Sequence, residues 1–296
     1  MNKKKIGVVI DSSTTYDEKY IKDNNVEILP LCITDVNENK SFNDDGISIT
    51  HETIIDGLEN KKNYKTSATQ VGVFLKKMEE MFIKYEDVIF IPISYGLSSQ
   101  YDQAKNIIKE EFPNLHIVKS QSGALANEFI LENVIEMINN KENIGTIIEN
   151  SEKMYDNIFE IFSVEHIENI IRSGRILKTA VNLIKLMKIK PIFILKVSNH
   201  LSGFGKKFES IIAKMLEKIK KNFNFVLEKN KIIKIGIMHT LKWDESKLNY
   251  LINEIKKYFK LASNKSIIKR LIPNTVLTHT NKGSFGICIY AKNDKK

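Results

Sequence analysis

Four short segments rich in hydroxyl side chains are the parts of this sequence best suited to chemistry. Three follow apolar runs that predict buried strands, and the fourth lies between two predicted helices. Ligands of open α/β sheets bind where the carboxyl ends of parallel strands meet, so we expect the four segments to converge on one edge. Hydroxyls and backbone N–H groups at helix N-termini bind anions without a fixed positive charge. The segments are Asp11–Thr15, Thr66–Thr69, Ser94–Ser99 and Ser120–Gly123.

Helix capping is the alternative explanation of these hydroxyl groups. Ser and Thr are preferred N-cap residues, and Thr69 and Ser99 both stand just before predicted helices. Capping explains any one of the segments well. With four segments expected at one edge, capping and an anion pocket both remain open.

Other chemistries find less support in the sequence. There is no GxxxxGK[ST] loop, no GxGxxG loop, no HExxH motif and no Cys/His cluster, so neither a cofactor nor a metal is expected. The run from Gly96 to Gln100 begins like a nucleophile elbow but lacks its last glycine. Asp11 follows a strand as a phosphoryl-accepting Asp would, but Ser13 stands where a second carboxylate is needed.

Composition narrows the class of protein. The 296 residues are 42% hydrophobic and 27% charged, which is typical of a globular protein. No apolar run approaches the ~20 residues of a membrane span, and Ile6–Ile10 is too short for a secretory signal, so we expect a cytoplasmic protein. The only two cysteines, Cys32 and Cys288, lie in apolar strand-like runs, which argues against a disulfide scaffold.

The net charge of +9 raises the question of a nucleic-acid partner. Only three of the 45 basic residues are Arg, and the lysines are scattered among Glu and Asn. Because nucleic-acid readers favour Arg for bidentate contacts, we interpret the lysines as compositional drift and expect no nucleic acid. Two of the three arginines, Arg172 and Arg175, stand three residues apart, which indicates planar multi-donor contacts within the protein, to a ligand or to a partner.

The order of predicted elements indicates an α/β protein with two domains. Strand and helix patterns alternate in residues 1–160, which predicts an N-terminal α/β domain with a largely parallel sheet. A second α/β pattern fills residues 161–296. The predicted strands are 6–10, 26–33, 88–93, 115–118, 158–164, 191–195, 232–238, 267–271 and 284–291, and the predicted helices are 48–59, 71–85, 100–112, 125–139, 144–157, 207–227 and 245–259.

Seven short motifs, in this order, give the chain a family resemblance. None of them is specific alone, but together they resemble the DegV family of bacterial fatty-acid-binding proteins over essentially the whole chain. The motifs are Ile10-Asp11-Ser12-Ser13, Pro30-Leu31, Thr66-Ser67, Ser94 to Ser98, Gly174-Arg175-Ile176, Ile189-Lys190-Pro191 and His279-Thr280.

The sequence also departs from the pattern of that family at several positions. Thr-Ser usually continues as Gln-Pro-Ser, where this chain has Ala68-Thr69-Gln70. Gly-Leu-Ser usually continues as Gly-Thr, where this chain has Ser99-Gln100. These differences bear on acyl-chain preference and on partner affinity more than on the binding function.

The resemblance implies two α/β domains with a long-chain fatty acid of the C14–C18 class buried between them. It implies that the hydroxyls of Thr66, Ser67 and Ser98, together with His279, hold the carboxylate. Ser94, in the same turn as Ser98, and Arg175, in the Gly-Arg-Ile motif, complete the expected ligand-binding residues. The C-terminal domain would cover the acyl chain.

Two functional hypotheses follow. In the favoured one, the protein is a carrier without catalytic residues that presents the fatty acid to an ATP-dependent fatty acid kinase subunit, with transient contact of its Lys-rich surface to membrane. The alternative is a stand-alone Ser-dependent acyl hydrolase or phosphotransferase that would lose activity in Ser98→Ala. The incomplete elbow and the missing second carboxylate count against that alternative.

Overall fold

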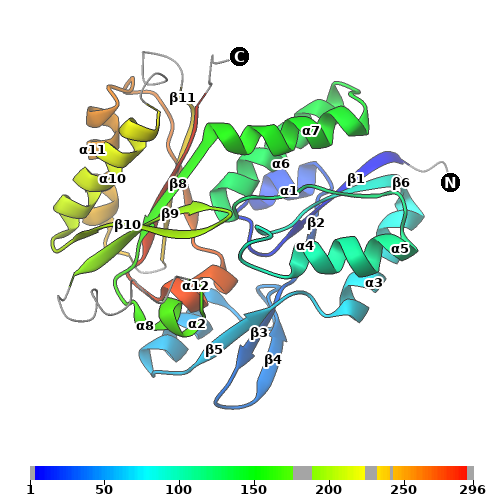
Figure 1. Cartoon of the computed structure of the whole chain (residues 1–296), viewed down its shortest axis with the longest axis horizontal. Helices are drawn as coiled ribbons and strands as arrows, with labels where there is room; N and C mark the ends of the chain where they lie inside the picture. Colours follow the sequence, from blue (N-terminus) through cyan, green and yellow to red (C-terminus); the bar gives the residue numbers. More distant parts are fainter. Residues whose placement is uncertain (1–3, 176–188, 224–231, 241–242, 292–296) are drawn as a thin grey trace. The chain divides into compact units, whose positions relative to one another are not determined.

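The computed structural model describes residues 4–175, 189–223, 232–240 and 243–291 (Figure 1). Contacts between residues divide the chain into two compact units. Unit 1 comprises Met1–Tyr155 and the short return segment Pro273–Thr278, and unit 2 comprises Asp156–Ile272 and His279–Lys296. Chain positions more than 100 residues apart therefore meet in unit 1.

A four-stranded parallel sheet forms the centre of unit 1. Its strand order is β2-β1-β6-β7, and every neighbouring pair is parallel. The inner parts of the two central strands, residues 8–10 and 88–91, are apolar and buried, as expected of strands covered on both faces. The predicted parallel sheet is confirmed. Its strands are β2 (Glu27–Leu29), β1 (Lys4–Asp11), β6 (Tyr85–Ile91) and β7 (Leu115–Ile117).

Helix α3 (Val71–Lys84) covers one face of this sheet, as its apolar stripe predicts. Phe74, Met78 and Met81 are buried, and they belong to one cluster with Val9 and Phe90 of the central strands. Phe74 and Phe90 meet edge to face with ring centroids 5.2 Å apart. Alternate residues of β1 and β6 point to the opposite face. The other helices of unit 1 are α1 (Glu18–Asp23), α2 (His51–Glu59), α6 (Ala124–Asn139) and α7 (Ile144–Met154), which leads into the 3₁₀ turn η2 (Tyr155–Asn157).

The helix predicted over residues 100–112 is present but interrupted. It consists of α4 (Gln100–Gln103), the π-helical turn η1 (Ala104–Ile108) and α5 (Lys109–Glu111). The helix ends at Phe112, as expected for the residue before Pro113.

The prediction of one strand over residues 26–33 is wrong. The run is broken at Pro30 into β2 and β3 (Cys32–Asp35), which belong to different sheets. Proline has no N–H to donate to a sheet, and the next amide, Leu31 N, donates to Ser12 Oγ at 3.0 Å instead of to a strand. The small antiparallel sheet that follows has the order β4-β3-β5, with β4 (Lys40–Asn43) and β5 (Tyr64–Ser67).

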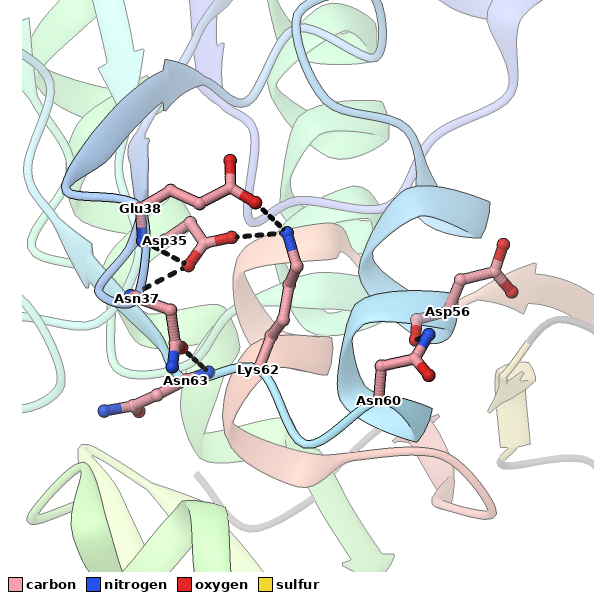
Figure 2. Close-up of polar contacts among 7 residues, drawn as sticks. All are labelled: Asp35, Asn37, Glu38, Asp56, Asn60, Lys62 and Asn63. Carbon is pink, nitrogen blue, oxygen red and sulfur yellow. Dashed lines mark hydrogen bonds and ion pairs between the residues drawn. The ribbon is translucent and has the colours of Figure 1, made fainter.

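Figure 2 shows the polar contacts that hold the turn between β3 and β4. Asp35 accepts hydrogen bonds from the amides of Asn37 and Glu38 at 2.9 and 3.3 Å. Lys62 donates to both Asp35, at 2.9 Å, and Glu38. Asn63 N donates to Asn37 Oδ1 at 2.8 Å. These contacts tie the turn to the segment between α2 and β5, and so they fix the start of the strand that carries Thr66 and Ser67.

Unit 2 is built on a six-stranded sheet of order β10-β9-β8-β13-β11-β12. All its pairs are antiparallel except β11 with β12. Helices α10 and α11 lie side by side on one face and bury Ile212, Met215 and Leu251 in a common core (Figure 1). The strands are β8 (Ile158–Ser163), β9 (Lys190–Lys196), β10 (Ser198–Gly205), β11 (Ile232–His239), β12 (Ile268–Leu271) and β13 (Phe285–Ala291). The helices are α8 (Glu168–Arg172), α10 (Phe208–Asn222) and α11 (Glu245–Tyr258), and α12 (Asn274–Thr280) spans the junction of the units.

The sequence did not predict two of these elements, β10 and α12. Strand β10 is rich in Ser and Gly and lacks a strong apolar alternation, and α12 is only two turns long. The part of the helix predicted for residues 207–227 that follows Phe223 lies outside the described residues. Among the residues the structure describes, no helix combines the length and apolar character that crossing a bilayer requires.

Candidate functional site

Three of the four hydroxyl-rich segments meet at the carboxyl end of the parallel sheet. Ser94 N donates to the carbonyl of Ser122 at 2.7 Å, and Tyr95 N donates to that of Ser120 at 3.2 Å. Ala124 N donates to the carbonyl of Ser13 at 2.9 Å. The predicted convergence is therefore confirmed for the segments that follow β1, β6 and β7.

Asp11 holds two of these segments together from inside the protein. The carboxylate is fully buried and accepts hydrogen bonds from Ser13 N at 3.1 Å, Ser13 Oγ at 2.5 Å and Ile93 N at 2.6 Å. The pKa of Asp11 is raised to about 6, chiefly by burial and to a smaller extent by the charge of Asp44. The hydrogen bonds from Ser13 and Ile93 act in the opposite direction and lower this pKa. Asp11 thus links the β1 and β6 turns.

In the turn from Ser94 to Ser98, the hydroxyls of the buried Ser94 and the partly buried Ser98 both accept backbone hydrogen bonds. Ser94 Oγ accepts from Gly96 N at 3.2 Å, and Ser98 Oγ accepts from Gln100 N at 3.2 Å. A hydroxyl that accepts one hydrogen bond keeps its own hydrogen for donation. The hydrogen of the Ser98 hydroxyl is not used in this bond.

Thr66 and Ser67 are placed differently from the sequence-based expectation. They are the last two residues of β5, opposite Ile33 and Cys32 of β3, and so belong to the small antiparallel sheet and not to a loop between helices. Ser67 is exposed, and its hydroxyl donates to the carbonyl of Ala68 at 3.3 Å. The segment that begins in this edge strand is bonded through Thr69 to α4, the helix that follows the Ser94–Ser99 turn.

Thr69 joins the two segments through glutamine side chains that the sequence did not single out as functional. Gln100 Oε1 accepts from Thr69 N at 2.9 Å, while Gln100 Nε2 donates to Thr69 Oγ1 at 2.9 Å. Gln103 Nε2 donates to the carbonyl of Thr69 at 2.7 Å. We name Thr69, Gln100 and Gln103 the Thr69 clamp. The sequence signal that pointed here was the unusual Gln100 after Ser99.

Two further predicted residues, Arg175 and His279, belong to unit 2. Burial and, to a smaller extent, the positive charge of Arg175 together lower the pKa of His279 to about 3. His279 is therefore a neutral imidazole at physiological pH, which donates from one nitrogen and accepts at the other.

Arg175 is held by its surroundings in unit 2. Its guanidinium donates to the carbonyl of Ser173, and its own carbonyl accepts from Asn199 Nδ2 at 3.1 Å. Burial lowers the pKa of Arg175. The neighbouring Arg172 Nη2 donates to Asn169 Oδ1 at 2.7 Å, within its own helix. Ile176, the last residue of the Gly-Arg-Ile motif, lies outside the described residues.

Sequence reasoning also missed a polar chain in unit 1 formed by Asp44, Asn274 and His51. Asn274 Nδ2 donates to Asp44 Oδ1 at 3.0 Å, and Asn274 Oδ1 lies 3.0 Å from His51 Nδ1. Burial raises the pKa of Asp44 to about 6. No motif marks these residues, because the contact depends on the return of residues 273–278 to unit 1.

No group of three His, Cys, Asp or Glu side chains in the described part of the chain is arranged to hold a metal ion. The donors gathered at the carboxyl end of the sheet are hydroxyls and amides. This donor set suits an anionic or polar headgroup better than a cation.

Comparison with known proteins identifies the family. Residues 5–292 match the family described as "Uncharacterised protein, DegV family". The chain belongs to the DegV family. A DegV domain-containing protein of Ureaplasma parvum is 33% identical over 294 residues, which cover 99% of this chain and 98% of the relative. The resemblance inferred from the seven motifs is confirmed.

Solved structures of other DegV proteins share the fold. A fatty-acid-binding DegV family protein from Thermus thermophilus superposes with a TM-score of 0.84 at 20% identity, covering 98% of this chain and all of that one. The Fatty Acid Kinase (Fak) B3 protein of Streptococcus pneumoniae, solved with linoleic acid, gives a TM-score of 0.79 at 15% identity, covering 98% and 100%. At these identities the likeness establishes the mixed α/β fold.

Proposed function

We propose that this protein binds a long-chain fatty acid and holds its carboxylate mainly with neutral hydroxyl and imidazole donors. The observation that carries the proposal is the convergence of three hydroxyl-rich turns, none of which contains Lys or Arg, at the carboxyl end of the parallel sheet. Neutral donors orient a carboxylate without locking it into a tight ion pair. The fatty-acid-binding relatives from Thermus thermophilus and Streptococcus pneumoniae support the choice of ligand.

We assign the headgroup to Thr66, Ser67, Ser94 and Ser98 of unit 1, with His279 and Arg175 of unit 2 completing the network. The acyl chain supplies most of the affinity in this proposal. Burial of a C16 chain contributes on the order of 12 kcal/mol gross, at ~0.8 kcal/mol per methylene, before the cost of ordering chain and protein.

In this proposal the protein is a cytoplasmic carrier that presents the carboxylate to an ATP-dependent fatty acid kinase subunit for acyl-phosphate formation. The kinase name of the Streptococcus pneumoniae structure supports this partner. The carrier needs no cofactor and no catalytic residue of its own, and it meets the membrane transiently to exchange its ligand. No nucleic acid takes part.

Mass spectrometry of solvent extracts tests the proposal directly. Purified protein is expected to retain a long-chain acid, and Ser98→Ala and His279→Ala should lower the retained amount while the fold persists. Ser99→Ala is the matched control, because Ser99 is exposed and its side chain makes no capping bond. Lipid-free preparations that also fail to take up added oleate or palmitate would overturn the proposal.

A further inference from the structure

Every polar group of Thr69 is hydrogen-bonded, although the residue lies in a connecting segment. Its N–H, carbonyl and hydroxyl oxygen are engaged by Gln100 and Gln103, as described above. Its hydroxyl hydrogen is donated to the carbonyl of Pro30 at 2.8 Å. Thr69 and Gln100 are both buried, so these bonds exchange little with water and resist local opening.

The clamp connects the two segments that carry the proposed headgroup donors. On one side it holds the end of β5, two residues beyond Ser67. On the other side, the backbone N–H of Gln100 donates to Ser98 Oγ. Gln100 therefore binds Thr69 through its side-chain amide and the Ser98 hydroxyl through its backbone N–H.

The clamp also joins two positions that the sequence motifs single out. Thr69 and Gln100 stand at the two places where the sequence departs from the family pattern, in Ala68-Thr69-Gln70 and in Ser99-Gln100. In the fold these two departures are bonded to each other, 31 residues apart in the sequence. Thr69 and Gln100 therefore form one hydrogen-bonded contact.

We propose that the Thr69 clamp is a positioning device that sets the separation between Thr66 and the Ser98 hydroxyl, and thereby the preference of the site for a free carboxylate. This inference rests on the proposed function and names how its headgroup specificity is set. Gln100 does not touch the ligand. It acts through Ser98 and through the end of β5.

The ratio of affinities for a fatty acid and for its methyl ester measures headgroup recognition apart from chain burial. Palmitate and methyl palmitate bury the same chain, but only the acid accepts charge-assisted hydrogen bonds. Gln100→Leu removes both hydrogen bonds between the Gln100 side chain and Thr69, and Thr69→Val removes the bond to the Thr69 hydroxyl; each replaces a polar side chain by an apolar one of similar size. Both should lower the acid-to-ester ratio by about tenfold, the worth of one hydrogen bond to a charged group.

Three companion variants complete the experiment. Thr69→Ser keeps the hydroxyl and should restore most of the ratio. Gln70→Ala removes an exposed amide beside the clamp and should leave the ratio unchanged, because Gln70 makes no capping bond. Ser98→Ala combined with Gln100→Leu should lower the ratio by less than the product of the two single effects, because part of the Gln100 effect passes through the Ser98 hydroxyl.

The outcomes separate this inference from the proposed function. A wild-type chain that prefers the acid, together with clamp variants that keep the parent ratio, either with both affinities unchanged or with both lowered by the same factor, overturns the clamp and leaves the proposed carrier function intact. A wild-type chain that binds neither compound overturns both. If Gln100→Leu does not fold, Thr69→Val with its Thr69→Ser rescue decides the question.

Discussion

Asn274 donates a hydrogen bond to Asp44 across 230 residues of sequence, at 3.0 Å. The same Asn274 side chain meets His51 at the start of α2, so one amide connects three separate parts of unit 1. Residues 273–278 interrupt the chain of unit 2 and are assigned to unit 1 by their contacts. The Asn274 amide is a specific polar anchor of this return segment.

Replacing Asn274 by Ala should destabilise unit 1. The change leaves the buried carboxylate of Asp44 without that donor, which costs about 2 kcal/mol of unfolding free energy. Urea denaturation followed by circular dichroism measures the loss. Asn60→Ala is a suitable control, because the Asn60 amide bonds only its own helix at an exposed site. An equal loss in both variants would contradict a special role for Asn274.

The stability of the protein should depend on pH through Asp44. The pKa of Asp44 is raised to about 6 by burial, so between about pH 4 and pH 6 the folded chain binds more protons than the unfolded chain. The free energy of unfolding then falls as pH rises through this window. Asp44→Asn removes this contribution and keeps an oxygen facing Asn274. At about pH 7.5 the variant should be more stable by on the order of 2 kcal/mol.

Denaturation at about pH 5 and about pH 7.5 tests the sign of this effect. The free energy of unfolding at the lower pH minus that at the higher pH should become smaller in Asp44→Asn. The same difference should stay unchanged in Glu86→Gln, which removes an exposed charge. His279 contributes the opposite slope, because its pKa is lowered to about 3 and stability is lost as pH falls below its ordinary value. An Asp44→Asn curve parallel to that of the parent would refute the assignment.

Two glycines in helices should respond to alanine in opposite directions. A Cβ on Gly57 of α2 would lie 2.0 Å from the hydroxyl of Tyr64, so Gly57→Ala should destabilise by about 1–3 kcal/mol. Gly72 of α3 has no atom within 4 Å of such a Cβ and is exposed, so Gly72→Ala should stabilise by up to about 1 kcal/mol. Thermal melts of the pair measure both signs, and a stabilised Gly57→Ala would show that the close packing of Tyr64 relaxes freely.

The charge of the protein is divided unequally between its units. Unit 1 has 17 Lys and Arg against 25 Asp and Glu, a net charge of −8, and unit 2 has 28 against 11, a net charge of +17. A compositional drift toward lysine would make both units more basic. It therefore does not explain why the net charges of the two units have opposite signs. If the proposed membrane contact is electrostatic, unit 2 should provide it.

Lys220→Glu with Lys221→Glu should weaken binding to phosphatidylglycerol vesicles by at least about tenfold, because each Lys near an anionic surface contributes about 1 kcal/mol. Both lysines are exposed in the last turn of α10. Lys76→Glu with Lys105→Glu makes the same change of charge on unit 1 and should have a smaller effect. Sedimentation with vesicles at low and high salt provides the measurement. Equal losses in the two double variants would contradict a directed contact.

The sequence alone determined the elements that depend on local pattern. The run Ile6–Ile10 is apolar enough to be recognised as a buried strand, and the stripe of Phe74, Met78 and Met81 as a helix face, because both periodicities lie within a few residues. Strand ends carrying Ser and Thr then predicted where three turns would meet. The order of its motifs also revealed the family.

Only the tertiary structure decided which distant groups become partners. Pro30 splits one apolar run between two sheets, and that division depends on the bond from Leu31 N to Ser12. The sequence marked Gln100 only as a departure from the motif pattern and did not mark Asn274 at all, because the partners of a side-chain amide are set by the groups that folding brings to it. Their partners, Thr69 and Asp44, lie 31 and 230 residues away, beyond the reach of any local pattern.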